Sequence, residues 1–188
     1  NRELIFGYQK SSYNWRVATI PLGVGGRAYG GVAITQKLVD AFAMDTEHGG
    51  RYPITGYQAD GSPVIDPQSG YDESGFTSFT HPILGSTKSP YNMYLNREPR
   101  FYASIGFDRG TFEIDDKILT LQLRGGELHG STLKETDEYQ SCTGYLCQKW
   151  IHKSSTYNQS KNSYNYRKYA YPYLRLPELF YNYAEADF

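Results

Sequence analysis

The sequence predicts an α+β fold that is rich in loops and contains short strands, one β-hairpin and two helices. Apolar residues with helical spacing indicate one helix near residues 35–44 and another near residues 174–188. Alternating apolar residues on both sides of Asp115-Asp116-Lys117 indicate the hairpin. Stretches rich in glycine, proline, serine and aspartate separate these elements, and this composition is typical of loops.

The first helix is expected to begin after Thr35, whose side chain can accept a hydrogen bond from the backbone of the first turn. Leu38, Ala41 and Phe42 fall on one face, which we expect to pack inward. The polar, glycine-containing segment at residues 45–50 is expected to end the helix.

The second helix is expected at the end of the sequence. Its apolar stripe consists of Leu176, Leu179, Phe180, Tyr183 and Ala184. Pro177 suits the first helical position, where its missing N–H is no loss, and Glu178 lies in the first turn, where the helix dipole favours a carboxylate. A helix of about twelve residues is marginal in water, so the stripe needs a partner helix. We therefore expect a segment of a larger helical protein.

Three further segments are expected to be extended. Residues 2–9 form an apolar run that we expect to be a buried strand. Residues 101–107 alternate in polarity after Pro99, which pushes Glu98 into the extended region, so a strand is expected there. Residues 143–151 are expected to be another short extended piece.

Two long segments show no regular pattern. Residues 51–94 contain no convincing element, and a stretch of this length is either a functional surface loop or a region ordered by neighbouring parts. Residues 154–168 are polar and dotted with tyrosine, which indicates a loop. Both segments are therefore expected to lack strands.

Cys142 and Cys147 are the two cysteines of the chain. The four residues between them include a glycine and could permit a small disulfide loop, whereas an extended backbone would hold their Cα atoms too far apart. Two cysteines without matched histidines do not make a zinc site. We favour two free thiols that are mostly buried.

The overall composition excludes several classes of protein. The 188 residues suit one domain, and the formal net charge is −1, with acidic and basic residues interspersed. This is not the basic footprint of a nucleic-acid binder. No apolar run approaches the length that spans a membrane.

Tyrosine is the unusual component, with 19 residues against 9 phenylalanines and 2 tryptophans. Its flat apolar face and polar tip suit a wet surface that binds polar ligands, although a tyrosine can equally fill a loose core. Residues 13–31 combine aromatic, basic and glycine residues, and Trp15 either contacts ligand or anchors this loop to the core. The candidate ligand-binding residues are the platforms Tyr13, Trp15 and Tyr29 and the hydrogen-bonding Arg16 and Arg27.

Enzymatic chemistry is disfavoured by the sequence. Adjacent acids such as Asp72/Glu73 and Asp115/Asp116 are usually solvated, whereas glycosidase carboxylates must flank a cleft. The four histidines are scattered without the helical pairing of a metalloprotease, and no Gly-x-Ser-x-Gly elbow is present. No catalytic residue, metal ligand or cofactor site is therefore assigned.

Five segments, in order, resemble motifs of the SusD/RagB family. Asn96 to Ile105 resembles the strand N-R-D-P-R-F-Y-A-T-I, and Thr35 to Phe42 resembles the helix start P-T-Q-x-L-V-D-A-F. Arg175 to Ala186 resembles the helix R-x-A-E-x-x-x-x-Y-A-E-A. Residues 2–8 are similar to N-x-E-x-I-F, and residues 143–149 to T-G-Y-x-x-x-K. The departures are isoleucine at position 34 and proline at position 177, where the family usually has proline and alanine.

The resemblance implies a mostly α-helical parent built on tetratricopeptide-like repeats. Residues 1–188 would then be a single segment of a SusD/RagB-like domain, truncated at both ends. It implies a surface-exposed, lipid-anchored protein of the outer membrane that binds oligosaccharides without cleaving them. A SusC-like TonB-dependent transporter would take up the glycan. A peptide-binding RagB-like uptake lipoprotein is the nearest alternative, and a glycoside hydrolase is a less favoured one.

Arginines at the entrances of elements are expected to have structural roles. Arg97, Arg100 and Arg175 lie at such positions, where a guanidinium can satisfy backbone carbonyls or carboxylates. Trp150 follows an extended apolar stretch and is expected in the core.

Overall fold

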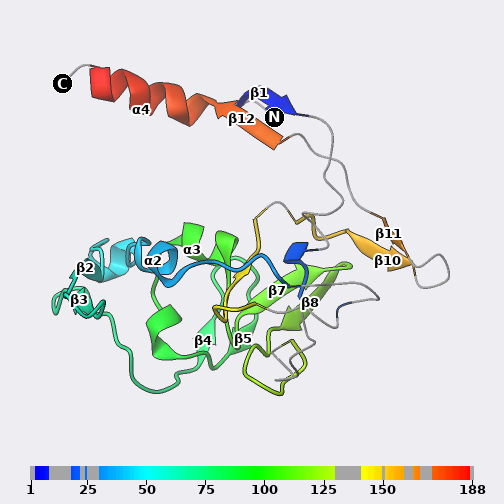
Figure 1. The fold of residues 1–188 in the computed structure, drawn as a ribbon, viewed down its shortest axis with the longest axis horizontal. Helices are drawn as coiled ribbons and strands as arrows, with labels where there is room; N and C mark the ends of the chain where they lie inside the picture. The colour runs from blue at the N-terminus through cyan, green and yellow to red at the C-terminus, as the bar shows by residue number, and fades with distance from the viewer. Residues whose placement is uncertain are drawn as a thin grey trace.

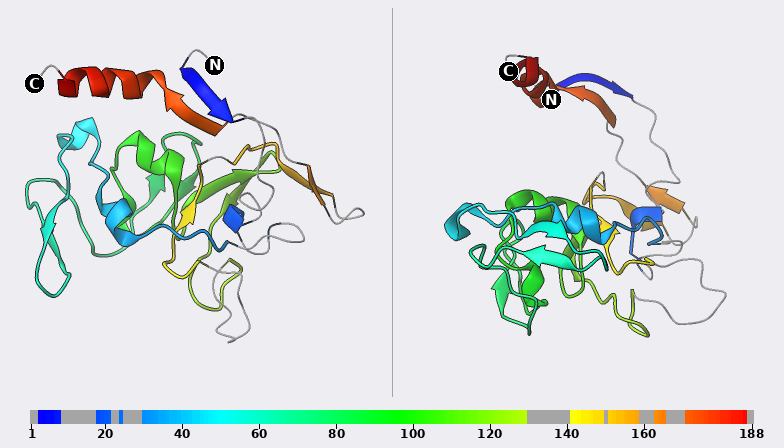
Figure 2. Two further views of the ribbon diagram at one scale, coloured as in Figure 1. Left: turned by 45° about the horizontal axis from the view of Figure 1, so that its top comes forward. Right: turned by 60° about the vertical axis from the view of Figure 1, so that its left-hand side comes forward.

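The computed structural model describes residues 3–8, 18–21, 24, 30–129, 141–149, 151–158, 163–165 and 171–186. Figures 1 and 2 show these residues in two layers. One layer holds β1 (Leu4–Tyr8), β12 (Tyr171–Arg175) and α4 (Leu176–Ala186), and the other is a body that contains the elements from α2 to β11. No helix in the described part of the chain combines the length and apolar character needed to cross a membrane.

The smaller layer brings the two ends of the described chain together. β1 pairs with β12 in antiparallel fashion, with Leu4 opposite Arg175 and Tyr8 opposite Tyr171. The strand prediction for this region is confirmed, but the prediction that it is buried is wrong, because Phe6 is 64% exposed. Among the described residues β1 pairs with β12 alone, in a two-stranded sheet that leaves Ile5 and Phe6 exposed.

Helix α4 follows β12 without a loop and confirms the helix predicted there. Glu178 Oε2 accepts a hydrogen bond from the backbone N–H of Arg175 at 3.0 Å, so the first turn is closed by its own carboxylate. Pro177 is the second residue of the helix instead of the first. No residue of α4 is buried, and its stripe faces solvent.

Helix α2 (Gln36–Asp40) begins as predicted. The Thr35 hydroxyl accepts a hydrogen bond from the N–H of Leu38 at 3.3 Å. The predicted inner face is right for Phe42, which packs against the aromatic cluster, and wrong for Leu38 and Ala41, which are exposed while Val39 is completely buried. The helix is also shorter than expected, because it ends at Asp40 and Ala41 is its C-cap residue.

The strand predicted at residues 101–107 is instead a helix for most of its length. Helix α3 (Pro99–Ser104) has proline at its first position and Glu98 as an extended N-cap. Only its end continues as β6 (Ile105–Gly106), which pairs with β9 (Leu146–Cys147). Pro99 did place Glu98 in the extended region as predicted, but it then started a helix.

The predicted hairpin is confirmed. Strands β7 (Thr111–Ile114) and β8 (Lys117–Thr120) pair in register across a two-residue turn. Asp115 and Asp116 occupy this turn with φ of 57° and 52°, the left-handed conformation that such hairpins require. Aspartate tolerates this conformation better than most residues, so the local sequence specifies the turn.

The segments expected to lack strands contain three small hairpins. These are β2 (Ile54–Tyr57) with β3 (Pro63–Ile65), β4 (Phe79–Thr80) with β5 (Thr87–Lys88), and β10 (Thr156–Asn158) with β11 (Ser163–Asn165). Short 3-10 turns at Thr46–His48 and Asn92–Tyr94 complete the body. The fold class is therefore α+β and loop-rich as predicted, but with three α-helices instead of two and with four hairpins in the described residues.

The body has two hydrophobic clusters. One gathers around the β7–β8 hairpin and contains Ile20, Phe112, Ile114, Leu121 and Leu146. The other is aromatic and joins α2, α3 and the 3-10 turn at Asn92–Tyr94; it contains Ile34, Val39, Tyr94, Phe101, Tyr102, Ile105, Phe107 and Tyr145. Three of the 19 tyrosines, Tyr94, Tyr102 and Tyr145, thus belong to the core, whereas others such as Tyr52, Tyr181 and Tyr183 are exposed.

Both cysteines are free thiols, as predicted. Cys142 is exposed, so the expectation that it is buried is wrong. Cys147 lies in β9 and is partly covered, and this burial raises the pKa of its thiol.

Candidate functional site

The five residues predicted to bind ligand lie outside the described residues. Tyr13, Trp15, Arg16, Arg27 and Tyr29 all belong to segments between residues 9 and 29 whose structure is not described. Trp150, predicted in the core, also lies outside. The candidate site below is therefore built from other residues.

A cavity of about 320 Å³ lies where the two hydrophobic clusters meet. We call it the aromatic cavity. Its volume is at the lower end of the range of small-molecule sites, roughly 300–1,000 Å³. It is lined by Gln36, Phe76, Tyr91, Tyr94, Asp108, Leu123, Arg124, Thr143, Gly144 and Tyr145.

One wall of the aromatic cavity consists of two rings. Phe76 and Tyr91 are joined by an isolated antiparallel bridge, and their ring centroids lie 5.4 Å apart. The N–H of Asn92 donates to the carbonyl of Gly75 at 3.0 Å and extends this pairing. Phe76 is 53% exposed, so a well-held aromatic ring remains open to a ligand.

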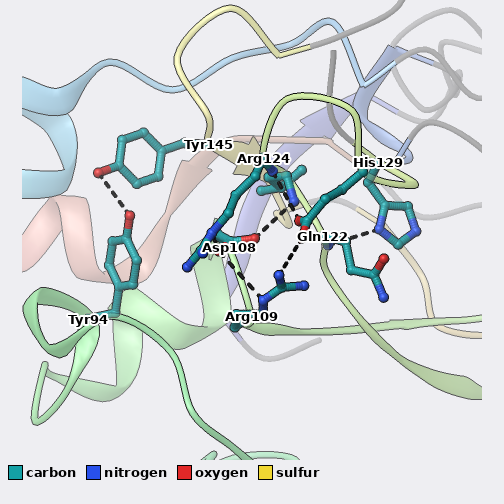
Figure 3. A network of polar contacts seen from close by, with 9 residues as sticks. Tyr94, Asp108, Arg109, Gln122, Arg124, His129 and Tyr145 are labelled. Atoms are coloured by element: carbon teal, nitrogen blue, oxygen red, sulfur yellow. Dashed lines mark hydrogen bonds and ion pairs between the residues drawn. The ribbon is translucent and has the colours of Figure 1, made fainter. Parts of the chain in front are cut away.

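Two tyrosine hydroxyls form the floor. Tyr94 OH donates to Tyr145 OH at 3.4 Å, and Tyr145 OH donates to Gln36 Oε1 at 2.7 Å (Figure 3 shows the first contact). Burial raises the pKa of both tyrosines, so both hydroxyls stay protonated at physiological pH. Each one therefore keeps a neutral oxygen with spare acceptor capacity.

Two residues of the cavity lining, Asp108 and Arg124, carry charge. Asp108 Oδ2 accepts a hydrogen bond from Arg124 Nε at 2.8 Å, and Oδ1 accepts one from the N–H of Leu123 at 3.0 Å (Figure 3). The turn that presents Asp108 requires Gly110, since a Cβ there would lie 2.8 Å from the carbonyl oxygen of Phe107. The Arg124 guanidinium also lies 5.0 Å from the ring centroid of Phe76, so Arg124 links Asp108 to the aromatic wall.

A clasped loop holds Arg124 in this position. The N–H of Gln122 donates to His129 Nδ1 and the N–H of His129 donates to the carbonyl of Gln122, both at 3.0 Å (Figure 3). Within the loop, the Glu127 carboxylate binds the Arg109 guanidinium, and Arg109 continues to Asp108 at 3.8 Å. Asp108, Arg109, Arg124 and Glu127 thus form one charge-paired network behind the cavity.

The aromatic cavity offers binding chemistry. Flat rings can stack on the C–H faces of a polar ligand, while the guanidinium, the hydroxyls and the carboxylate can donate to or accept from its hydroxyl groups. The described residues contain no cluster of three or more metal-ligating side chains.

The acid pairs named from the sequence have local partners. Asp72 accepts hydrogen bonds from the backbone and hydroxyl of Ser74, which lower the pKa of its carboxyl. Asp115 and Asp116 form the hairpin turn. Neither pair lines the aromatic cavity.

Sequence reasoning missed most of this site. Phe76 and Tyr91 lie in the segment that showed no pattern, and Arg124 follows the predicted hairpin in a stretch to which the sequence assigned no role. The available signal was the alternative reading of residues 51–94 as a functional surface loop. Tyr145 was noted within a family motif, but its position in the cavity depends on packing far along the chain.

Comparison with solved structures finds SusD-like folds. Two structures of the protein "BT4246" match with TM-scores of 0.71 and 0.67, at 23% and 24% identity, over 98% of this chain and 30% and 29% of theirs. A SusD-like protein from Bacteroides fragilis NCTC 9343 matches with a TM-score of 0.59 at 28% identity, over 99% of this chain and 32% of its own. The chain therefore spans about three tenths of the length of these structures.

Comparison with curated protein sequences gives no match. The family model described as "SusD family" matches residues 2–188, which is nearly the whole chain. The motif resemblance found in the sequence is thereby confirmed, and the fold agrees with it. This chain belongs to the SusD family.

Proposed function

We propose that this chain belongs to a surface protein that captures oligosaccharides without cleaving them, and that the aromatic cavity is one of its contact sites. Family membership implies a nutrient- or glycan-binding lipoprotein of the outer membrane. Delivery of the glycan to a SusC-like TonB-dependent transporter is part of the same proposal. The observation that carries it is one cavity that holds both the Phe76–Tyr91 ring pair and the Arg124 guanidinium, which lies over Phe76.

Sugar rings combine apolar C–H faces with hydroxyl groups at their edges. Phe76 is 53% exposed and offers a ring to the apolar face, and the Arg124 guanidinium lies over that ring, 5.0 Å from its centroid, with donors for the edge. The Tyr94–Tyr145–Gln36 chain supplies neutral oxygens in the same cavity. A polar ligand therefore meets both kinds of contact within one volume of about 320 Å³.

Calorimetry of the longer native protein against a panel of oligosaccharides and peptides tests this proposal. We expect an oligosaccharide to bind and Phe76→Ala to weaken it roughly tenfold to hundredfold, since burying a phenylalanine is worth about 1.5–3 kcal/mol. Phe180→Ala is the matched control, because Phe180 is also exposed, at 65%, but lies in α4 away from the cavity. It should leave the affinity unchanged.

Peptide binding without oligosaccharide binding would overturn the proposal in favour of a RagB-like uptake protein. If Phe76→Ala and Phe180→Ala changed the affinity equally, the aromatic cavity would not be a contact site for the oligosaccharide. Reducing-sugar release during the incubation would show a glycoside hydrolase instead. Tyr13, Trp15, Tyr29, Arg16 and Arg27 remain proposed as further ligand contacts.

A further inference from the structure

We propose that the aromatic cavity selects uncharged sugars and disfavours acidic ones such as uronic-acid oligomers. This inference rests on the proposed function and adds the charge class of the ligand. It follows from the way charge and hydrogen-bonding capacity are arranged around Arg124.

The positive charge of Arg124 at the cavity is neutralised by an ion pair. Arg124 pairs with Asp108, whose carboxylate is 17% exposed and lines the same cavity. Behind this pair, Arg109 binds Glu127, so the network contains two guanidiniums and two carboxylates. Among the described residues the cavity wall therefore presents no net positive charge to attract an anion.

Two further carboxylates, Asp72 and Asp40, bond to residues at or next to the cavity lining. Asp72 accepts a hydrogen bond from Asn92 at 3.0 Å, and Asn92 directly follows Tyr91 of the aromatic wall. Asp40 lies behind Gln36 and accepts a hydrogen bond from its amide at 2.7 Å. The charge of Asp40 is countered by the buried Arg97 guanidinium, whereas Asp72 adds negative potential that raises the cost of bringing a ligand carboxylate close.

The remaining hydrogen-bonding capacity also matches hydroxyl groups. Arg124 uses Nε for Asp108, and within the described residues its two Nη groups stay available as donors toward a ligand. Tyr145 OH and Asp108 each keep an acceptor lone pair beyond the bonds described above. A sugar hydroxyl both donates and accepts and so satisfies both kinds of group. A carboxylate only accepts, and it would leave Asp108 facing a like charge.

The test compares neutral and acidic trisaccharides on the longer native protein. Calorimetry uses maltotriose, cellotriose, mannotriose and xylotriose against trigalacturonate at low salt. We expect at least one neutral trisaccharide to bind at least tenfold more tightly than trigalacturonate. Raising the salt from about 20 mM to about 500 mM should leave the neutral affinity unchanged and strengthen the acidic one, because salt screens the repulsion.

Asp108→Asn then removes the carboxylate that neutralises Arg124, and it should shift the acidic-to-neutral affinity ratio at least threefold toward the acid. Asp60→Asn is the control, since the hydrogen bonds described for Asp60 are to Ser62 in the turn of the β2–β3 hairpin, away from the cavity lining. Circular dichroism verifies that both variants are folded. The salt series on the unaltered protein decides the matter if Asp108→Asn does not fold.

Equal or tighter binding of trigalacturonate that is sensitive to Phe76→Ala would overturn the selectivity while leaving the proposed function in place. A ratio that moves equally in both aspartate variants would overturn the role of Asp108. Failure of every saccharide to bind would overturn the proposed function and this inference together.

Discussion

Arg97 is the most deeply buried charged side chain among the described residues, with 1% of its surface exposed. Its guanidinium donates to the carbonyls of Val39 and Phe42, both at 2.8 Å, and to that of Met93 at 3.3 Å. The same group lies 5.2 Å from the ring centroid of Phe101. One side chain thus ties the end of α2 to the segment before α3, which confirms the predicted structural role.

Arg97→Lys is expected to destabilise the protein by about 2–4 kcal/mol. Lysine keeps the charge but cannot reach three carbonyls, and each lost hydrogen bond to a charged group costs about 1.5–3 kcal/mol before relaxation. Urea unfolding followed by circular dichroism measures the change. Arg100→Lys is the control, because that side chain is 72% exposed and pairs only with Glu98. Similar losses in both variants would contradict the role given to Arg97.

At the scale of elements, the body depends on short turns that are held by specific contacts. The loop after β8 is clasped by the mutual hydrogen bonds of Gln122 and His129 and carries Arg124 to the cavity. His81 plays a similar part between β4 and β5, where its Nδ1 accepts hydrogen bonds from the N–H groups of Ile83 and Leu84. In both turns Nδ1 must be unprotonated to accept these bonds.

Stability is expected to fall as the pH drops from 7 to 5. Burial lowers the pKa of His129, partly offset by Glu127, and burial also lowers the pKa of His81. Below about pH 6.5 the unfolded chain binds protons that the folded chain does not, which favours unfolding by at most about 1.4 kcal/mol per pH unit and histidine. The free energy of unfolding begins to fall near the pKa that each histidine has in the unfolded chain. It stops falling below the lower pKa that the histidine has in the folded protein. Urea unfolding at each pH measures it.

His129→Asn should reduce this pH dependence, since asparagine can still accept a hydrogen bond but does not titrate in this range. His152→Asn is the matched control, because His152 is exposed. If the pH dependence of the stability is unchanged in His129→Asn, protonation of His129 does not contribute to it.

At the scale of the whole molecule, the layer of β1, β12 and α4 exposes an unusual amount of apolar surface. Phe180 is 65% exposed and Tyr183 71%, and Phe6 and Tyr173 add two more rings from the paired strands, 6.0 Å apart. Exposed apolar patches of this kind mark surfaces that associate with other elements or proteins. The expectation that α4 needs a partner helix therefore stays a prediction.

Replacing Phe180 and Tyr183 together by glutamine is expected to lower the binding of an apolar fluorescent dye to this chain, because the stripe loses two of its largest groups. The urea midpoint of the body should stay within error, since no residue of α4 is buried. Asn182→Gln is the control on the polar side of the helix. An unchanged dye signal, or a joint loss of body stability, would contradict this description of α4.

Features that depend on contacts between neighbouring residues could be predicted from the sequence. The Thr35 cap, the hairpin turn at Asp115 and Asp116, and the helix closed by Glu178 each rest on contacts within a few positions. Such contacts recur wherever the same local pattern occurs, so they could be predicted, and the ordered motifs identified the family for the same reason.

The conformation of residues 101–104 and the composition of the aromatic cavity depend on long-range packing and could not be predicted from the sequence. Residues 101–104 could alternate as a strand or wind as a helix, and packing of Phe101 and Tyr102 into the aromatic cluster accompanies the helix. The cavity joins Phe76, Arg124 and Tyr145, which are far apart along the chain. Their meeting depends on long-range burial, because no local rule links residues separated by dozens of positions. The sequence thus determined the elements and the family, and the packing of these elements determined the site.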